Sequence, residues 1–312
     1  MVTIDKTSPA PTPTPSGGSN TTGVRDTRGV RVFRWVNAII LTVVAAVTLY
    51  PFLNIVAESL SDEQFIRAGR VSLIPRGFNF DTYRLIAGDE AFWRSYANTV
   101  LYTVVATLIA ITLTTMYAYV LSKHRLKGRG LLIGIAVFTM FFNGGLIPNY
   151  VLISGLGLKN TIWAVVLPNA LSIFNLLVMK AFFEALPKEL EEAAAVDGLN
   201  TYGTLWRIVL PLSKPVLATM ILFYAVANWN SWFTAFLYLD KADMFPVTVY
   251  LRNMIAGATS ATSVGAGSGD LAQISANIKS VTMVLTVLPI VLVYPFIQRF
   301  FVSGVMLGAV KQ

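Results

Sequence analysis

The sequence contains no cysteine and only one histidine, His124. The lack of cysteine excludes disulfides, a thiolate nucleophile, an iron–sulfur cluster and a lipid-modified N-terminal cysteine. A single histidine cannot build a multi-histidine metal site, and His124 lies in a basic stretch where we expect it to be solvated. We therefore predict neither a metal site nor a catalytic residue in this chain.

Charge is also scarce, since charged residues make up 13% of the 312 residues whereas 55% are apolar. A soluble domain carries about 25% charged residues, so the deficit indicates a membrane protein. Strands of a membrane barrel would be ~10 residues long and strictly alternating, a pattern the sequence does not show. We predict an all-α, polytopic fold with six transmembrane helices, because six uncharged stretches approach the ~20 residues that a helix needs to cross a bilayer. These stretches are residues 35–57, 95–122, 131–158, 160–179, 215–239 and 280–298.

The net charge of +8 could indicate nucleic acid, but the positions of the basic residues favour a membrane interpretation. One cluster precedes the first predicted span, and a second fills the short loop between the second and third spans. Basic residues of short loops remain on the cytoplasmic side. We therefore predict a cytoplasmic N-terminus, a cytoplasmic C-terminus, a lipid environment and no nucleic-acid partner. The clusters are Arg25, Arg28, Arg31 and Arg34, and Lys123, Arg125, Lys127 and Arg129.

The first 30 residues are rich in threonine, proline, serine and glycine. Such a composition does not pack, so we predict that residues 1–30 are a disordered cytoplasmic tail and that residues 31–312 form the transmembrane domain. The first apolar run is too long for a signal peptide, and we expect it to remain as an anchor. The long segments 58–93 and 240–277 are predicted to lie outside the membrane.

A short polar-to-amphipathic passage separates the fourth and fifth predicted spans. Pro187 suits the start of a helix, and Gly198 suits the left-handed conformation that ends one. Asn200 or Thr201 can cap a second helix that stops before Pro211. The pattern predicts two cytoplasmic helices joined by a glycine turn, typical of a docking element. The alternative is a helical loop that stays on the bilayer surface.

Residues 191–198 (EEAAAVDG) and 208–215 (IVLPLSKP) resemble the EAA loop of permease subunits of bacterial ABC importers, in the form typical of the carbohydrate branch. Residues 141–150 and 156–161 resemble the oligosaccharide or uronide permeases of the LplC/YtcP group. The resemblance implies a type I permease fold with an EAA coupling loop at about 184–215. It assigns contact with an ATPase to Glu192, Ala193, Ala194, Asp197, Gly198, Ile208, Leu210 and Pro211.

The resemblance further implies the rest of the assembly and its place in the bacterial cytoplasmic membrane. The partners would be a second permease subunit, two ATPase subunits and an extracytoplasmic substrate-binding protein. The sequence itself has no Gly-x4-Gly-Lys-Ser/Thr motif, so it does not bind ATP through a P-loop. We expect no cofactor in this chain, with ATP and Mg bound and hydrolysed in the partner ATPase.

Amides and indoles at membrane depth are the candidates for a sugar path. Amides hydrogen-bond hydroxyl groups, indoles stack on sugar faces, and both are costly against lipid. The alternative is amide bonding between helices and an interfacial aromatic belt. The candidates are Asn228, Trp229, Asn230 and Trp232, followed by Asn143 and Asn149.

Other functions remain open at this stage. The same importer type could carry an amino acid or a peptide. An intramembrane enzyme is a second class, but the sequence has no intramembrane acid pair, no His/Cys cluster and no Gly-x-Ser-x-Gly motif. A membrane scaffold or receptor is a third, and it would leave the helix–glycine–helix element without a purpose. The sequence does not identify the sugar.

Overall fold

A computed structural model describes residues 28–142, 144–263, 277–292 and 295. The chain forms two compact units, Met1–Pro51 and Phe52–Gln312, and each is considered by itself. The described residues are helical, with one isolated bridge between Ser61 and Phe78 and no longer strand.

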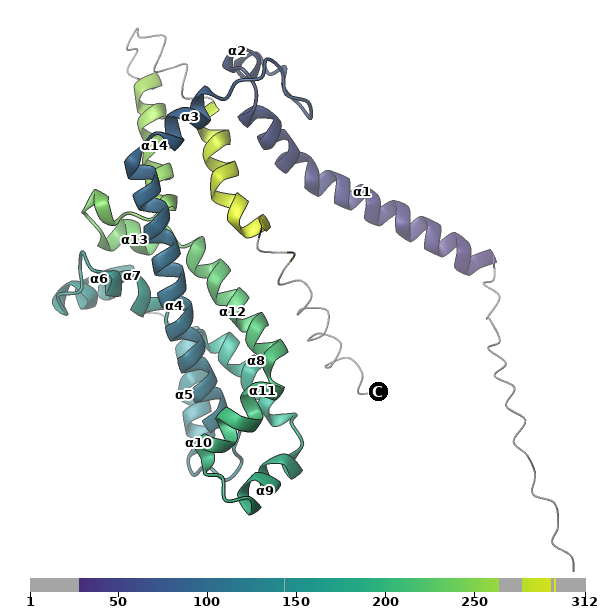
Figure 1. Cartoon of the computed structure of the whole chain (residues 1–312), viewed down its shortest axis with the longest axis vertical. Coiled ribbons are helices and arrows are strands. Elements are labelled where there is room, and N and C mark those ends of the chain that lie inside the picture. The colour runs from purple at the N-terminus through teal and green to yellow at the C-terminus, as the bar shows by residue number, and fades with distance from the viewer. Residues whose placement is uncertain (1–27, 143, 264–276, 293–294, 296–312) are drawn as a thin grey trace, which may run out of the picture. The chain divides into compact units, whose positions relative to one another are not determined.

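Figure 1 labels the helices in chain order. The long and medium helices are α1 (Arg28–Ser59), α4 (Glu90–Ser122), α5 (Arg129–Phe141), α6 (Leu146–Gly155), α8 (Ile173–Glu184), α9 (Lys188–Val196), α12 (Lys214–Trp229) and α14 (Val247–Ser263). The short ones are α2 (Glu63–Arg67), α3 (Asp81–Ala87), α7 (Ile162–Val166), η1 (Leu167–Asn169), α10 (Thr201–Thr204), η2 (Leu205–Val209), α11 (Leu210–Leu212), α13 (Phe233–Tyr238) and η3 (Ala242–Met244). A further apolar helix covers Asn277–Leu292.

Helix α1 begins at Arg28, so the last three residues of the predicted tail, 28–30, are helical. Residues 1–27 lie outside the described residues. The apolar side chains of α1 up to Pro51 are exposed. Within the described part of the chain, α1 and α4 are the two continuous helices long and apolar enough to cross a membrane.

The remaining predicted spans are not single straight helices. The third, predicted over 131–158, is the pair α5 and α6, which meet at an angle of 111°. The glycines and the proline within residues 143–149 predict an interruption of this span, and it is present, because α5 ends at Phe141 and α6 begins at Leu146. Gly145 precedes α6 with φ +88°, a backbone conformation that residues with a β-carbon rarely adopt.

The fourth and fifth predicted spans are also broken. η1 and α8 are separated by a 52° bend, and α12 ends at Trp229 before the short helix α13. The helix of the sixth predicted span is described only to Leu292; most of the remainder, to residue 298, lies outside the described residues. The six-span count therefore stays a prediction.

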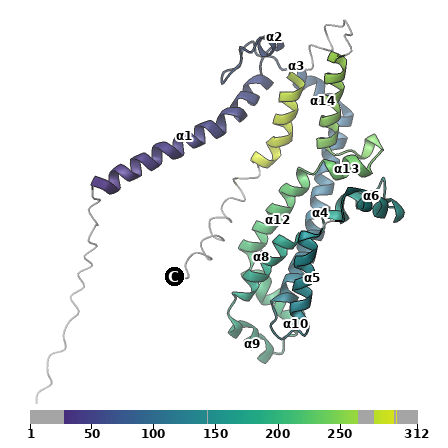
Figure 2. The ribbon, with the colours of Figure 1, turned by 180° about the vertical axis from the view of Figure 1, so that it is seen from behind.

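Helix α4 is the centre of the second unit and packs against α8 and α12 (Figure 2). Its inner face carries small and hydroxyl side chains one turn apart, including Ala106, Ala110, Thr114 and Ala118, all of them buried. Small residues let helix backbones approach closely, which is how helices pack where lipid removes the hydrophobic drive. Its other face exposes large apolar residues such as Leu108.

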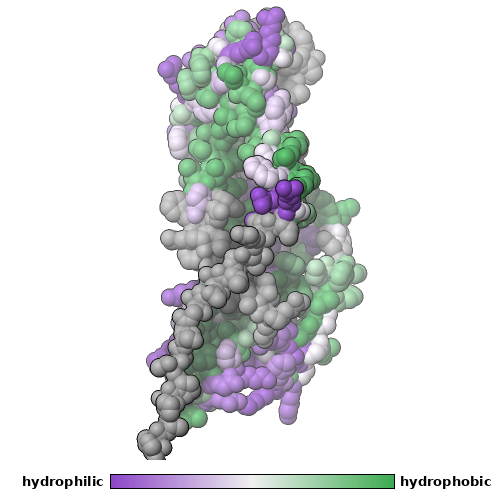
Figure 3. Space-filling model, turned by 90° about the vertical axis from the view of Figure 1, so that its right-hand side faces the viewer, coloured by the Kyte–Doolittle hydropathy of each residue, from purple (hydrophilic) through white to green (hydrophobic). Residues whose placement is uncertain are grey.

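Two segments predicted to lie outside the membrane meet at the N-terminal end of α4. Ile86 and Phe92 pack in one apolar cluster with Val247 and Leu251 of α14. The Gly/Ser/Ala-rich tract from Gly257 to Asp270 predicts a flexible loop, but α14 continues into it as far as Ser263; the rest of the tract lies outside the described residues. Figure 3 shows hydrophobic side chains over much of one face and a hydrophilic patch at its lower end, where α9 and α10 lie in Figure 1.

Candidate coupling and substrate sites

Helix α9 ends in the glycine turn that the sequence predicts. Gly198 has φ +76°. Its N–H donates to the Ala195 carbonyl at 3.1 Å, and the Leu199 N–H donates to the Ala194 carbonyl at 2.9 Å. This pair of bonds satisfies carbonyls left free at a helix end and needs a left-handed residue between them. Gly198 therefore sets the direction in which the chain leaves α9.

The second helix starts at the predicted cap but ends later than predicted. The Asn200 side chain accepts a hydrogen bond from the Gly203 N–H at 2.8 Å. The helical path then continues through η2 and α11 to Leu212, past Pro211. η2 is a π-helical turn, and this wider winding replaces the i to i−4 geometry in which a proline ring clashes with the preceding turn. The prediction of a stop before Pro211 is wrong by two residues.

The EAA-loop residues do not all point the same way. Glu192, Ala193, Asp197 and Pro211 are exposed, and Ile208 and Leu210 are half-buried. Ala194 is only 1% exposed and packs inside the chain. The two alanines therefore face different surroundings, and only Ala193 is open to a partner.

Three large side chains on this element were not singled out from the sequence. Val196, at the end of α9, is 88% exposed, and Tyr202 and Trp206 are each 70% exposed. Tyr202 and Trp206 are four residues apart, so they lie on one face of a helix. This four-residue spacing of two aromatic side chains is the sequence signal from which the exposed surface could have been predicted. Exposed aromatic side chains of this size are typical anchors of protein interfaces.

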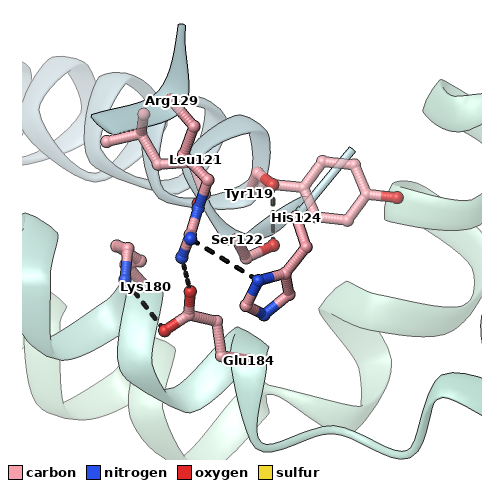
Figure 4. A network of polar contacts seen from close by, with 7 residues as sticks. All are labelled: Tyr119, Leu121, Ser122, His124, Arg129, Lys180 and Glu184. Carbon is pink, nitrogen blue, oxygen red and sulfur yellow. Dashed lines mark hydrogen bonds and ion pairs between the residues drawn. The ribbon is translucent and has the colours of Figure 1, made fainter. Parts of the chain in front are cut away.

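Charged side chains join the C-terminal ends of α4 and α8 to the start of α5 (Figure 4). Glu184 pairs with Arg129 and with Lys180, whose Nζ lies 2.8 Å from its carboxylate. From the four-residue spacing of Lys180 and Glu184 the sequence predicts that Lys180 either pairs with Glu184 or snorkels, and the structure shows the pair. The guanidinium of Arg129 also donates to the Leu121 carbonyl at 2.7 Å. His124 is exposed and lies 3.5 Å from Arg129.

A cavity of about 980 Å³ lies where η1 breaks from α8, facing α12. Its lining is mainly apolar and includes amide and hydroxyl groups, with no charged side chain among the lining residues described. The polar lining residues are Asn169, Ser172, Asn175, Tyr224, Asn228, Asn230 and Ser231. Of this set, the sequence predicts only Asn228 and Asn230 as residues of a sugar path. The others lie at a helix break that hydrophobicity alone does not locate.

The other predicted path residues lie elsewhere. Trp229 is 9% exposed, and its Nε1–H donates to the Thr286 carbonyl at 3.1 Å. Trp232 lies under the Arg252 guanidinium, 4.3 Å from the ring centre, instead of lining the cavity. Asn149 is exposed on α6, and Asn143 lies outside the described residues.

The apolar helices and the exposed helix–glycine–helix element fit a membrane protein with a docking surface, and comparison with known proteins gives its class. The family model for the binding-protein-dependent transport system inner membrane component matches residues 85–306. The chain belongs to this family.

Individual relatives are similar over nearly their whole length. Protein LplC of Bacillus subtilis (strain 168) is 40% identical over 92% of this chain and 98% of its own length. The polygalacturonan/rhamnogalacturonan transport system permease protein YtcP of the same organism is 38% identical over 87% of this chain and 95% of its own length. A crystal structure of a bacterial ABC transporter for import of the acidic polysaccharide alginate has a chain that superposes with a TM-score of 0.78. That chain is 34% identical, and the match covers 88% of this chain and 98% of that one.

Proposed function

We propose that the chain is one permease subunit of an ATP-driven importer that passes an oligosaccharide across the bacterial cytoplasmic membrane. The observation that carries the coupling half of this proposal is the exposed surface of Val196, Tyr202 and Trp206 on the helix–glycine–helix element. A large apolar surface on a polar element marks a protein interface. Because the sequence has no P-loop, the ATPase that would occupy it is a separate chain.

The ATPase contact is proposed to combine this apolar surface with the charged rim of the EAA loop. Glu192 and Asp197 supply exposed carboxylates, Ala193 allows close approach, and Gly198 fixes the turn. Ala194, Ile208 and Leu210 support the element from within, and Pro211 lies near its end. Such a helix would seat in a groove of the partner.

The cavity beside α8 is the proposed section of the sugar path in this chain. Its amides, among them Asn175, Asn228 and Asn230, can donate to and accept from hydroxyl groups. Apolar walls with a few polar groups are typical of small-molecule sites. The sugar class is supported by the relatives named for polygalacturonan/rhamnogalacturonan and alginate. An amino acid or peptide would require a partner for its charged groups, which the described lining of this cavity does not offer.

Six crossings with both termini in the cytoplasm are proposed for the membrane domain. The six candidate segments are the continuous helices α1 and α4, the bent pairs α5–α6 and α7/η1–α8, helix α12, and the apolar helix Asn277–Leu292. In the assembly, a second permease would complete the path, two ATPase subunits would bind ATP and Mg, and an extracytoplasmic binding protein would deliver the sugar. The segments 58–93 and 240–277 are the proposed meeting place for that binding protein.

Uptake of labelled oligosaccharides by a strain lacking only this subunit tests the function. Restoring the intact chain is expected to restore uptake, whereas Asn228→Ala is expected to reduce it about tenfold through loss of hydrogen bonds to the sugar. Asn37→Ala, at an exposed position of α1 away from the cavity lining, is the matched control and is expected to behave as the intact chain. Full uptake in the deletion strain would contradict the proposal.

A further inference from the structure

Helix α4 is the unbroken connection between the two ends of the second unit. It runs for 33 residues without a proline or a break, which corresponds to about 50 Å. The helix pairs beside it are bent by 52° and 84°. A bend can absorb a displacement, whereas a continuous helix carries it along its axis.

Two polar contacts join the cytoplasmic end of α4 to the helix–glycine–helix element (α9 to α11, residues 188–212), called the coupling element below. Lys123, the residue that follows α4, forms an ion pair with Glu191 of α9. Its Nζ also lies 3.8 Å from the ring centre of Tyr119, a cation–π geometry. The Tyr119 hydroxyl in turn donates to the Thr201 carbonyl of α10 at 3.4 Å. Both helices of the element are thereby joined to one end of α4.

The opposite end of α4 holds the segment proposed to meet the binding protein. The Asn98 amide donates to the Asp243 carbonyl at 2.7 Å, and the Val247 N–H donates to the Thr99 hydroxyl at 2.7 Å. The Tyr250 hydroxyl donates to Asp89, the capping residue of α4. Movement of α4 along its axis would therefore move residues 243–250 with it.

We propose that Lys123 is a positioning residue for coupling: through Glu191 it locks α9 to α4, so that displacement of α9 by the ATPase reaches the external segment. This rests on the proposed function. The side chains of Lys123 and Glu191 are 26% and 36% exposed. Charge pairs on such a path change coupling between sites by severalfold.

A cysteine reporter tests this in the complete transporter, since the chain has no cysteine of its own. Ala227→Cys places a thiol in the cavity lining, and its labelling by a charged, membrane-impermeant maleimide is timed with and without ATP plus vanadate. Lys123→Met, Glu191→Gln and the double variant are compared in this background. Lys127→Met is the control, because Lys127 is an exposed lysine of the same loop with no ion pair among the described residues.

The expected result is an ATP-induced change in labelling rate that shrinks about fivefold in Lys123→Met and in Glu191→Gln, and no further in the double variant, because both act through one contact. The amount of assembled transporter and Lys127→Met should match the parent. An unaltered response in Lys123→Met, or additive losses in the double variant, would overturn the inference while leaving the proposed function standing. A parent that does not respond to ATP at all would overturn both.

Discussion

The hydroxyl of Tyr224 accepts a hydrogen bond of 3.1 Å from the backbone N–H of Ser172. The same hydroxyl lies 2.6 Å from that of Thr114 on α4, and Tyr224 is buried. Ser172 caps α8, where its own hydroxyl accepts from the Asn175 N–H. One tyrosine therefore joins α4, α8 and α12 at the wall of the cavity.

Tyr224→Phe is predicted to lower the stability of the subunit and to reduce transport. Removing the hydroxyl leaves the Ser172 N–H and the Thr114 hydroxyl without this partner, at a cost of about 1–3 kcal/mol. A fall of roughly 2–8 °C in the unfolding temperature of the purified transporter is expected. Tyr50→Phe, at an exposed position of α1, should leave it unchanged. An unchanged unfolding temperature in Tyr224→Phe would contradict this role.

The sequence predicted the elements whose determinants are local. Gly198, Asn200 and the interruption before Leu146 act through the conformation or capping of a few neighbouring residues, so their positions could be read directly. The position of the cavity could not be predicted from the sequence. It depends on the 52° break before α8 and on Tyr224 reaching Ser172 across 52 positions, a tertiary relationship that hydrophobicity does not encode.

Gly198→Leu is predicted to abolish ATP-driven uptake while membrane insertion continues. Space is not the obstacle, because a β-carbon at Gly198 would meet nothing within 4 Å. The obstacle is the backbone conformation at φ +76°, which costs a residue with a β-carbon about 1–2 kcal/mol of conformational free energy. The turn would therefore shift to another conformation. Gly198→Asn, which tolerates this region better, should retain part of the uptake.

Gly128→Leu provides the matched control for that experiment. Gly128 also has φ +76° and open space around it, but it precedes α5 in the basic loop. Its substitution introduces the same backbone strain outside the coupling element. Equal loss of uptake in both variants would show that strain itself, and not the direction of the coupling turn, is responsible.

Trp229→Phe is predicted to affect stability more than sugar transport, in contrast to Asn228→Ala. The indole of Trp229 is packed edge-on against Tyr96 and donates to the Thr286 carbonyl, so it is a structural contact between helices. Loss of the donor removes this hydrogen bond between helices, at a cost of about 0.5–1.5 kcal/mol. Thermal unfolding and uptake, each normalised to the amount of transporter, separate the two effects. If Trp229→Phe has normal stability but reduced uptake, Trp229 belongs to the sugar path and this prediction is wrong.

The pH dependence of stability should report the contact between Tyr250 and Asp89. Burial, followed by the hydrogen bond to Asp89, raises the pKa of the Tyr250 hydroxyl above its usual value of 10.0. A group whose folded pKa is raised stabilises the fold fully below its unfolded pKa and loses that contribution as pH rises through the folded value. Tyr250→Phe should thus be less stable than the parent up to about pH 10, and the gap should narrow above it. A gap that widens above pH 10 would contradict the assignment.

Some of the predicted EAA-loop and sugar-path residues are exposed or line the cavity and others are buried elsewhere, and one physical reason explains this difference. Motif spacing fixes which residues belong to an element, but burial is decided by what packs against it. Ala193 and Ala194 are adjacent in the motif, yet only Ala194 is enclosed. Trp229 and Asn230 are likewise adjacent, and only Asn230 reaches the cavity.

Crosslinking from Val196 tests the central claim most directly. Val196→Cys places a single cysteine at the end of α9, where the Val196 side chain is 88% exposed. Ile74→Cys, at a side chain that is 75% exposed in the segment 58–93, serves as the control. The account predicts that in intact cells a membrane-impermeant reagent labels only Ile74→Cys, and that in inside-out vesicles a short bifunctional reagent joins Val196→Cys to a nucleotide-hydrolysing subunit. Labelling of Val196→Cys from outside the cell, or the absence of any crosslink to such a subunit, would contradict it.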